Sequence, residues 1–132
     1  MQSKEKEEFI NAWVKSGQED LDVAEDLFKK KRYSYSLFFC HLSLEKILKA
    51  VFIAKNDDAP PPLHDLIKLC QKCGIKLNES KVKDLTEISS FNIEARYDVM
   101  KEKLYKKATV IFTKGYLSKT TLLFKQFEKL IS

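Results

Sequence analysis

The chain has 132 residues, of which 44% are hydrophobic and 33% are charged, a balance typical of a globular protein rather than a disordered one. Its length fits a single domain, residues 1–132, and leaves little room for a second. Only three glycines and three prolines are present, too few for the many turns of an all-β fold. The composition therefore favours long helices joined by few connections.

Lys and Arg number 24 against 19 for Asp and Glu, which gives a net charge of +5. This surplus suits a nucleic acid, a nucleotide or an acidic partner, and it equally suits a solvated lysine-rich surface. No apolar run reaches the ~20 residues of a membrane span, and the charged residues 1–8 do not resemble a secretory signal. Three cysteines cannot all pair within the chain. We therefore expect a cytoplasmic protein that does not contact a membrane.

Two long helices are predicted in the first half of the chain. From about Glu5 to Lys30, apolar residues recur at steps of three and four, as on one face of an amphipathic helix. The second helix begins near Tyr33 or Ser34 and ends near Lys55, and its apolar side chains cover nearly the whole circumference. A helix of that kind is buried by its neighbours, so this segment is the expected core helix.

The second half begins with a loop that holds three consecutive prolines and predicts three further helices. A glycine marks one helix end and an asparagine one helix start, while residues 89–103 lack clean periodicity. The expected helices are His64–Cys73, stopped by Gly74, then a helix from the N-cap Asn78 to about Ser89, and Tyr105–Ile131. We predict an all-α, antiparallel up-and-down helical bundle of about five helices, three long and two short.

Two polar residues interrupt the core helix. His41 and Glu45 lie four residues apart on the same side as Leu37 and Leu48, and a buried carboxylate is costly unless it is paired. Lys49 is one possible partner, in the favourable Glu-to-Lys orientation. We expect Arg96 to be the better one, because its guanidinium can hold a carboxylate at two points. The cluster is then either a structural ion pair or the lining of a cleft for a phosphate or base.

Motifs for metal or cofactor chemistry are weak or missing. Cys70 and Cys73 have CxxC spacing, but a single such pair on an apolar helix is more typical of core side chains than of a zinc or redox site. His64 is interpreted as a helix-start residue rather than a ligand. The sequence contains no glycine-rich phosphate loop, no HExxH motif and no nucleophile elbow. We predict no metal site and no cofactor.

Several motifs, in order along the chain, resemble the HEPN domain family of small prokaryotic helical proteins. The resemblance implies an up-and-down bundle that commonly dimerises around a shared cleft. The motifs are Trp13-x-x-x-Gly17-x-x-Asp20-Leu21-x-x-Ala24, Phe39-x-His41-Leu42-Ser43-Leu44-Glu45-Lys46-x-Leu48-Lys49-Ala50, His64-Asp65-Leu66, Phe91-Asn92-Ile93-Glu94-Ala95-Arg96-Tyr97-Asp98 and Tyr105-x-x-Ala108.

The resemblance implies two different kinds of activity, because members of the family differ in function. Ribonucleases of the family use an Arg followed after a few residues by His; Arg96 matches the arginine, but residues 97–132 contain no His. The acid–base role of that histidine is therefore unfilled, unless His41 reaches the same cleft. The proline often found after Arg-Tyr is also missing, with Asp98 in its place. Other members accompany a small, separately encoded nucleotidyltransferase, as its toxin partner or by binding its substrate.

Three functions follow as hypotheses. The leading one is a homodimer that binds a nucleotide or RNA, or a minimal nucleotidyltransferase partner in a toxin–antitoxin-like pair, and that lacks or nearly lacks catalysis. The alternatives are a metal-independent ribonuclease and a non-catalytic dimerisation or interaction module. In the leading hypothesis Arg96 and Tyr97 contact phosphate and base, with His41, Glu45 and Lys49 behind them.

Overall fold

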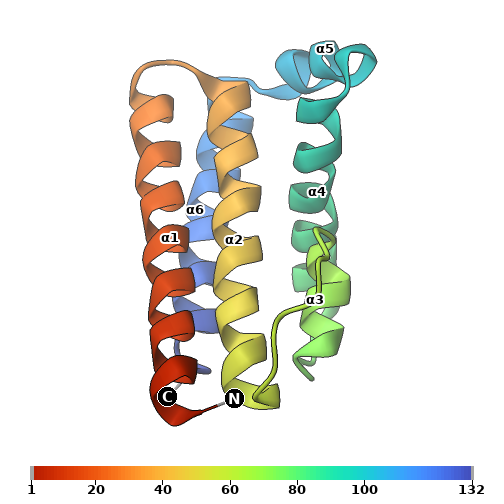
Figure 1. Ribbon diagram of the computed structural model, residues 1–132. Helices are drawn as coiled ribbons and strands as arrows, with labels where there is room; N and C mark the ends of the chain where they lie inside the picture. The colour runs from red at the N-terminus through yellow and green to blue at the C-terminus, as the bar shows by residue number, and fades with distance from the viewer. Residues whose placement is uncertain (1, 132) are drawn as a thin grey trace.

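The computed structural model describes residues 2–131, and within them it contains six α-helices and no strand (Figure 1). The all-helical prediction is confirmed, whereas the expected number of about five helices was one too low. The helices are α1 (Ser3–Lys29), α2 (Tyr33–Asn56), α3 (Leu66–Lys72), α4 (Glu79–Arg96), α5 (Asp98–Lys107) and α6 (Val110–Glu128). Figure 1 shows α1, α2, α4 and α6 running alternately up and down, with α5 across the upper end and α3 beside the lower part of α4.

The extra helix arises from two wrong boundaries in the second half. Helix α4 continues to Arg96, whereas the sequence-based prediction ended it near Ser89. The prediction ended too early because buried polar residues, Asn92 and Glu94, occupy the inner face of this part of the helix. Polar residues at core positions hide the periodicity on which the sequence-based prediction depends. The last helix begins at Val110 rather than Tyr105, since the side chain of Thr109 caps it by accepting a hydrogen bond from the backbone N–H of Phe112.

Helix α2 is the centre of the bundle, as its apolar circumference predicted. It packs against α1, α6, α4 and α3, and its position between the other helices is visible in Figure 1. Burying these side chains removes apolar area from water, the main favourable contribution to folding. The fully buried apolar residues of α2 are Leu37, Cys40, Leu44, Ile47, Leu48, Ala50, Val51 and Ile53.

One glycine allows α1 to approach α2 and α6 closely. A Cβ atom at Gly17 would lie 3.2 Å from the backbone oxygen of Ser43 on α2 and 3.1 Å from Cε2 of Phe124 on α6. Beside it, Lys46 of α2 pairs with Asp20 at 2.7 Å. The α1–α2 pair is therefore fixed by close backbone packing together with a cross-helix ion pair.

The proline-rich loop after α2 brings the next segment back to the core helix. Asp65 caps α3 by accepting from the backbone N–H groups of Ile67 and Lys68, so α3 begins two residues later than predicted and His64 lies outside it. At the other end of α3, Gly74 adopts a φ of 70°, the left-handed conformation that glycine allows at a helix end. No helix in residues 2–131 is long and apolar enough to cross a membrane.

Candidate functional site

The carboxylate of Glu45 is held by a lysine and a histidine rather than by Arg96. Its Oε2 accepts from Nζ of Lys49 at 3.1 Å, and its Oε1 accepts from Nδ1 of His64 at 3.0 Å. Glu45 and Lys49 are both buried, while the His64 side chain is 56% exposed. Burial opposes the charged form of Glu45, but the bonds from His64 and Lys49 outweigh it, and the pKa of Glu45 is lowered. The carboxylate is therefore ionised and paired.

His41 is fully buried one turn before Glu45. Its Nε2 lies 2.7 Å from the backbone oxygen of His64 and 3.9 Å from Oε1 of Glu45. A carbonyl oxygen can only accept, so Nε2 of His41 carries the hydrogen. Burial lowers the pKa of His41, which keeps the ring neutral. In this role His41 fixes the backbone of the loop that carries His64.

Arg96 does not reach Glu45, so the predicted pair between them is wrong. Its Nε donates to Oδ1 of Asn92 at 2.7 Å, and its guanidinium lies 5.9 Å from the ring centre of Phe38. The bond between Arg96 and Asn92 was not predicted, because both residues lie on the part of α4 beyond its predicted end near Ser89, where they stand one helical turn apart. Tyr97, the other predicted contact residue of this segment, is the exposed N-cap of α5.

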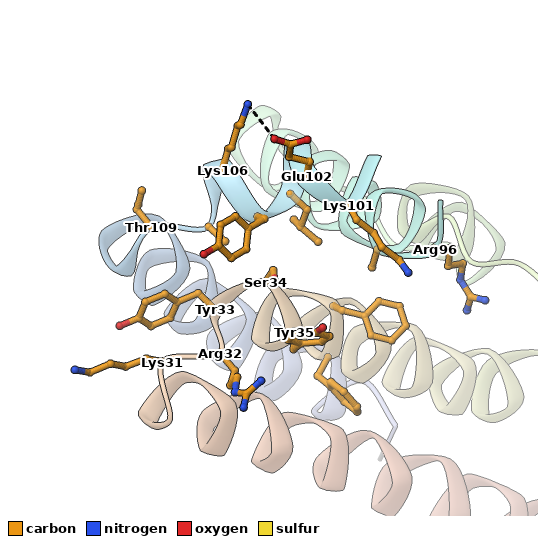
Figure 2. Close-up of a pocket in the computed structure, with 16 residues that line it drawn as sticks. Lys31, Arg32, Tyr33, Ser34, Tyr35, Arg96, Lys101, Glu102, Lys106 and Thr109 are labelled. Carbon is orange, nitrogen blue, oxygen red and sulfur yellow. Dashed lines mark ion pairs between the residues drawn. The ribbon is translucent and has the colours of Figure 1, made fainter. Parts of the chain in front are cut away.

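A cavity of about 1020 Å³ opens between the start of α2, the end of α4 and α5. Figure 2 shows Tyr33, Tyr35 and Arg32 on one side, Lys101, Glu102 and Lys106 on the other, and Arg96 at the end opposite Thr109. Five cationic side chains and one carboxylate line it. Glu102 pairs with Lys106 at 3.4 Å, the ion pair drawn in Figure 2. The cations are Lys31, Arg32, Arg96, Lys101 and Lys106.

Aromatic rings form much of the remaining wall of this cavity. Tyr35 and Tyr105 are well exposed, whereas Phe38 and Phe39 are half-buried and stand edge to face, with ring centres 5.8 Å apart. Rings offer a flat apolar surface on which a nucleobase can stack, and cations attract phosphate groups. The cavity thus combines the two kinds of side chain that recognise a nucleotide.

The family model for the HEPN domain matches residues 10–127, nearly the whole chain. The chain belongs to the HEPN domain family. No curated protein and no solved structure gives a significant match. The resemblance inferred from the motifs between Trp13 and Ala108 is therefore confirmed at the level of the family.

In this HEPN domain the predicted site residues fall into two groups. His41, Glu45 and Lys49 form one cluster with His64 on α2, and Arg96 lines the cavity at the end of α4. The groups meet on α2, because the Arg96 guanidinium lies 5.9 Å from the ring centre of Phe38, three residues before His41. Neither the pairing of His64 with Glu45 nor the cavity was predicted from the sequence. The available signal was the basic run ending at Arg32, followed directly by Tyr33 and Tyr35.

The cysteines of the HEPN domain lie in its interior. Cys40, Cys70 and Cys73 are free and buried, and burial raises their pKa values to about 12, 12 and 11. Thiols of this kind are poor nucleophiles and poor metal ligands because both roles need the thiolate. Across residues 2–131, no group of three or more His, Cys, Asp and Glu side chains is placed to hold a metal ion. The interpretation of the CxxC pair as core residues fits this burial.

Proposed function

We propose that this HEPN domain binds a nucleotide or single-stranded RNA in the cavity between α2 and α5. The observation that carries the proposal is the concentration of five cations and several aromatic rings around one space of about 1020 Å³. Ligand pockets for small molecules usually occupy roughly 300–1,000 Å³, so this cavity has room for more than one nucleotide unit.

Two kinds of side chain in the cavity would bind different parts of a nucleotide. Phosphate groups interact with Arg and Lys by charge-assisted hydrogen bonds, and bases stack on rings at about 1–3 kcal/mol per base. Three of the cations, Lys31, Arg32 and Arg96, form no ion pair with a carboxylate of the described chain. Arg96 keeps its Nη groups available, because only its Nε is bonded to Asn92. These cations are therefore free to exchange water for phosphate oxygen atoms.

The experiment measures binding of a fluorescent ten-nucleotide single-stranded RNA and of labelled ATP by anisotropy, at several salt concentrations. Arg96→Ala and Tyr35→Ala are compared with Lys83→Ala, which removes one charge from an exposed position on α4 outside the cavity. We expect weaker binding for both cavity variants. For Arg96→Ala, the slope of log affinity against log salt concentration should also become shallower by about 0.7 for each phosphate group that the arginine neutralises. Equal affinities of all four proteins would overturn the proposal.

Two partner proposals accompany this function and rest on the family resemblance. We propose a homodimer, which the exposed apolar residues Val99, Tyr105 and Ile111 on α5 and α6 support. We also propose that a minimal nucleotidyltransferase associates with it in a toxin–antitoxin-like pair. Light scattering after gel filtration tests the dimer, and co-purification with such an enzyme tests the pair. A dimer that binds neither RNA nor nucleotide would instead favour a pure interaction module.

A further inference from the structure

The unpaired positive charge of the cavity lies at two separate places. Two of its five cations are on α5, and both are already paired with a carboxylate. Lys101 pairs with Asp98 at 3.2 Å, and the pair of Lys106 with Glu102 is described above. The other three cations form no ion pair with a carboxylate of residues 2–131, and they come from the turn before α2 and from the last residue of α4. They are Lys31, Arg32 and Arg96.

These two places are well separated along α2. Figure 2 shows Lys31 and Arg96 at opposite ends of the cavity. The guanidinium of Arg96 lies 5.9 Å from the ring centre of Phe38, which is six residues after Arg32. At about 1.5 Å per residue, six residues span about 9 Å along the helix axis. The phosphates of a triphosphate are joined through single oxygen atoms, so such a group occupies one place and leaves the other empty.

The backbone of Lys31 suits glycine better than lysine. Its φ is 62°, in the left-handed region that is unfavourable for residues with a Cβ. Its N–H donates to the carbonyl of Phe28, and the N–H of the next residue, Arg32, donates to the carbonyl of Leu27. These two bonds form a Schellman motif at the end of α1, in which glycine is the usual residue at this position. Strained residues that persist are concentrated at ligand sites, so the strain points to a use for the lysine charge in the cavity.

At the other end, Arg96 is oriented from the interior of the protein. Asn92, which is 6% exposed, accepts from Nε of Arg96 at 2.7 Å. The ring of Phe38 lies against the same guanidinium. Only Nε is occupied by this bond, so the Nη groups remain available to donate to phosphate oxygen atoms. A buried side chain thus holds Arg96 ready for an anion at this end.

We propose that the cavity holds one nucleoside with phosphate groups at both its 5′ and its 3′ position, one bound at Arg96 and the other at Lys31 and Arg32. The base stacks on the aromatic wall between them, to which Tyr35 and Phe38 belong. This ligand chemistry occurs in a free nucleoside 3′,5′-bisphosphate and in every internal nucleotide of an RNA strand. The proposal rests on nucleotide binding in the cavity and narrows it to ligands whose phosphates are separated.

The test measures by isothermal titration calorimetry, at low salt, how tightly the protein binds adenosine 3′,5′-bisphosphate, both adenosine monophosphates and ATP. We expect the bisphosphate to bind about three- to tenfold more tightly than either monophosphate, because each monophosphate loses one cation contact. ATP carries about the same charge as the bisphosphate, gathered on one side of the nucleoside. It should bind more weakly than the bisphosphate, whereas general attraction to a chain of net charge +5 would bind the two alike.

The decisive variant is Lys31→Gly, because it separates binding from stability. Glycine relieves the left-handed backbone, so the urea concentration at the unfolding midpoint should rise. The bisphosphate should nevertheless bind about threefold more weakly. The matched control is Lys30→Gly, which removes the same charge from the preceding residue, where φ is −85° and the side chain does not line the cavity. This control should keep the wild-type affinity without a rise in the midpoint.

Arg96→Ala tests the other end of the cavity. It should weaken binding of the bisphosphate about tenfold. When a cation and the phosphate that it binds are both removed, the second removal should cost nothing further. Arg96→Ala should therefore be insensitive to the loss of one phosphate, and Lys31→Gly to the loss of the other.

The trinucleotide ApApA distinguishes the two sources of the ligand. Binding at least as tight as that of the bisphosphate identifies an internal nucleotide of RNA, and weaker binding identifies the free nucleotide; either result, with the affinities above, supports the proposal. If the ten-nucleotide RNA binds but the bisphosphate binds no more tightly than the monophosphates or ATP, this proposal alone is overturned. An unchanged affinity of Lys31→Gly, or insensitivity of both variants to the same phosphate, also overturns it. Absence of all nucleotide and RNA binding overturns the binding function as well.

Discussion

Replacing Glu45 by Ala removes the carboxylate on which the polar cluster of α2 depends. Lys49 then loses its only carboxylate partner within the described chain, at 3.1 Å, while its side chain is only 9% exposed. His64 loses the acceptor for Nδ1. Removing one partner of a buried ion pair costs about 3–5 kcal/mol, because the other charge remains buried without compensation.

Two features of the structure place the expected loss near the lower end of that range. The Lys49 ammonium lies 5.5 Å from the ring centre of Trp13, and a cation–π contact of this kind retains about 0.5–1 kcal/mol. The exposed His64 ring can turn to water once it is released. We therefore expect Glu45→Ala to lower the free energy of unfolding by about 3 kcal/mol.

Urea unfolding followed by circular dichroism measures this loss at neutral pH. The matched control is Glu102→Ala, which breaks the pair with Lys106, whose two side chains are 75% exposed; we expect a change below about 1 kcal/mol. The double variant Glu45→Ala/Lys49→Met removes both charges and should recover much of the stability. A loss for Glu45→Ala as small as that of Glu102→Ala, or no recovery in the double variant, would refute the reasoning.

Three further predictions concern packing, pH and the thiols. In urea unfolding, Gly17→Ala should be at least about 1 kcal/mol less stable than Gly115→Ala. Both substitutions improve helix propensity by the same amount, but the new Cβ at position 17 would be overpacked against its neighbours, whereas nothing lies within 4 Å of a Cβ at Gly115. Because the pKa of His41 is lowered in the folded protein, the unfolded chain takes up a proton first as the pH falls below 6.5. The urea concentration at the unfolding midpoint should therefore decrease below pH 6.5, and His41→Gln should make that decrease smaller. The lowered pKa of Glu45 makes its contribution complete above 4.5 and lost below it, so a second decrease should follow in more acid solution, absent from Glu45→Gln. A thiol reagent should modify the folded protein far more slowly than the urea-unfolded one, and rapid labelling of native protein would contradict the burial of Cys40, Cys70 and Cys73.

Much of the fold was predictable because its signals are local. The apolar stripe of α1, the apolar circumference of α2, the N-cap Asn78 and the helix stop at Gly74 were all identified from neighbouring residues. The end of α4 and the whole of α5 were not predicted, because Glu94 is buried in a core position where the periodic pattern expects an apolar residue. Its partner is Lys107, at 2.8 Å and 13 positions away. Only that non-local ion pair makes the burial of Glu94 acceptable.

For the site, the sequence by itself determined that a buried Glu45 needs a partner and that the chain resembles the HEPN family. Which partner it has was decided by the tertiary structure, because the proline loop returns His64 to α2 across 19 positions of sequence, while Asn92 holds Arg96 elsewhere. The cavity has the same origin: its two sides come from residues near 31–39 and 95–109. No periodicity or spacing connects those segments, and only the packing of α4 and α5 against the bundle brings them together.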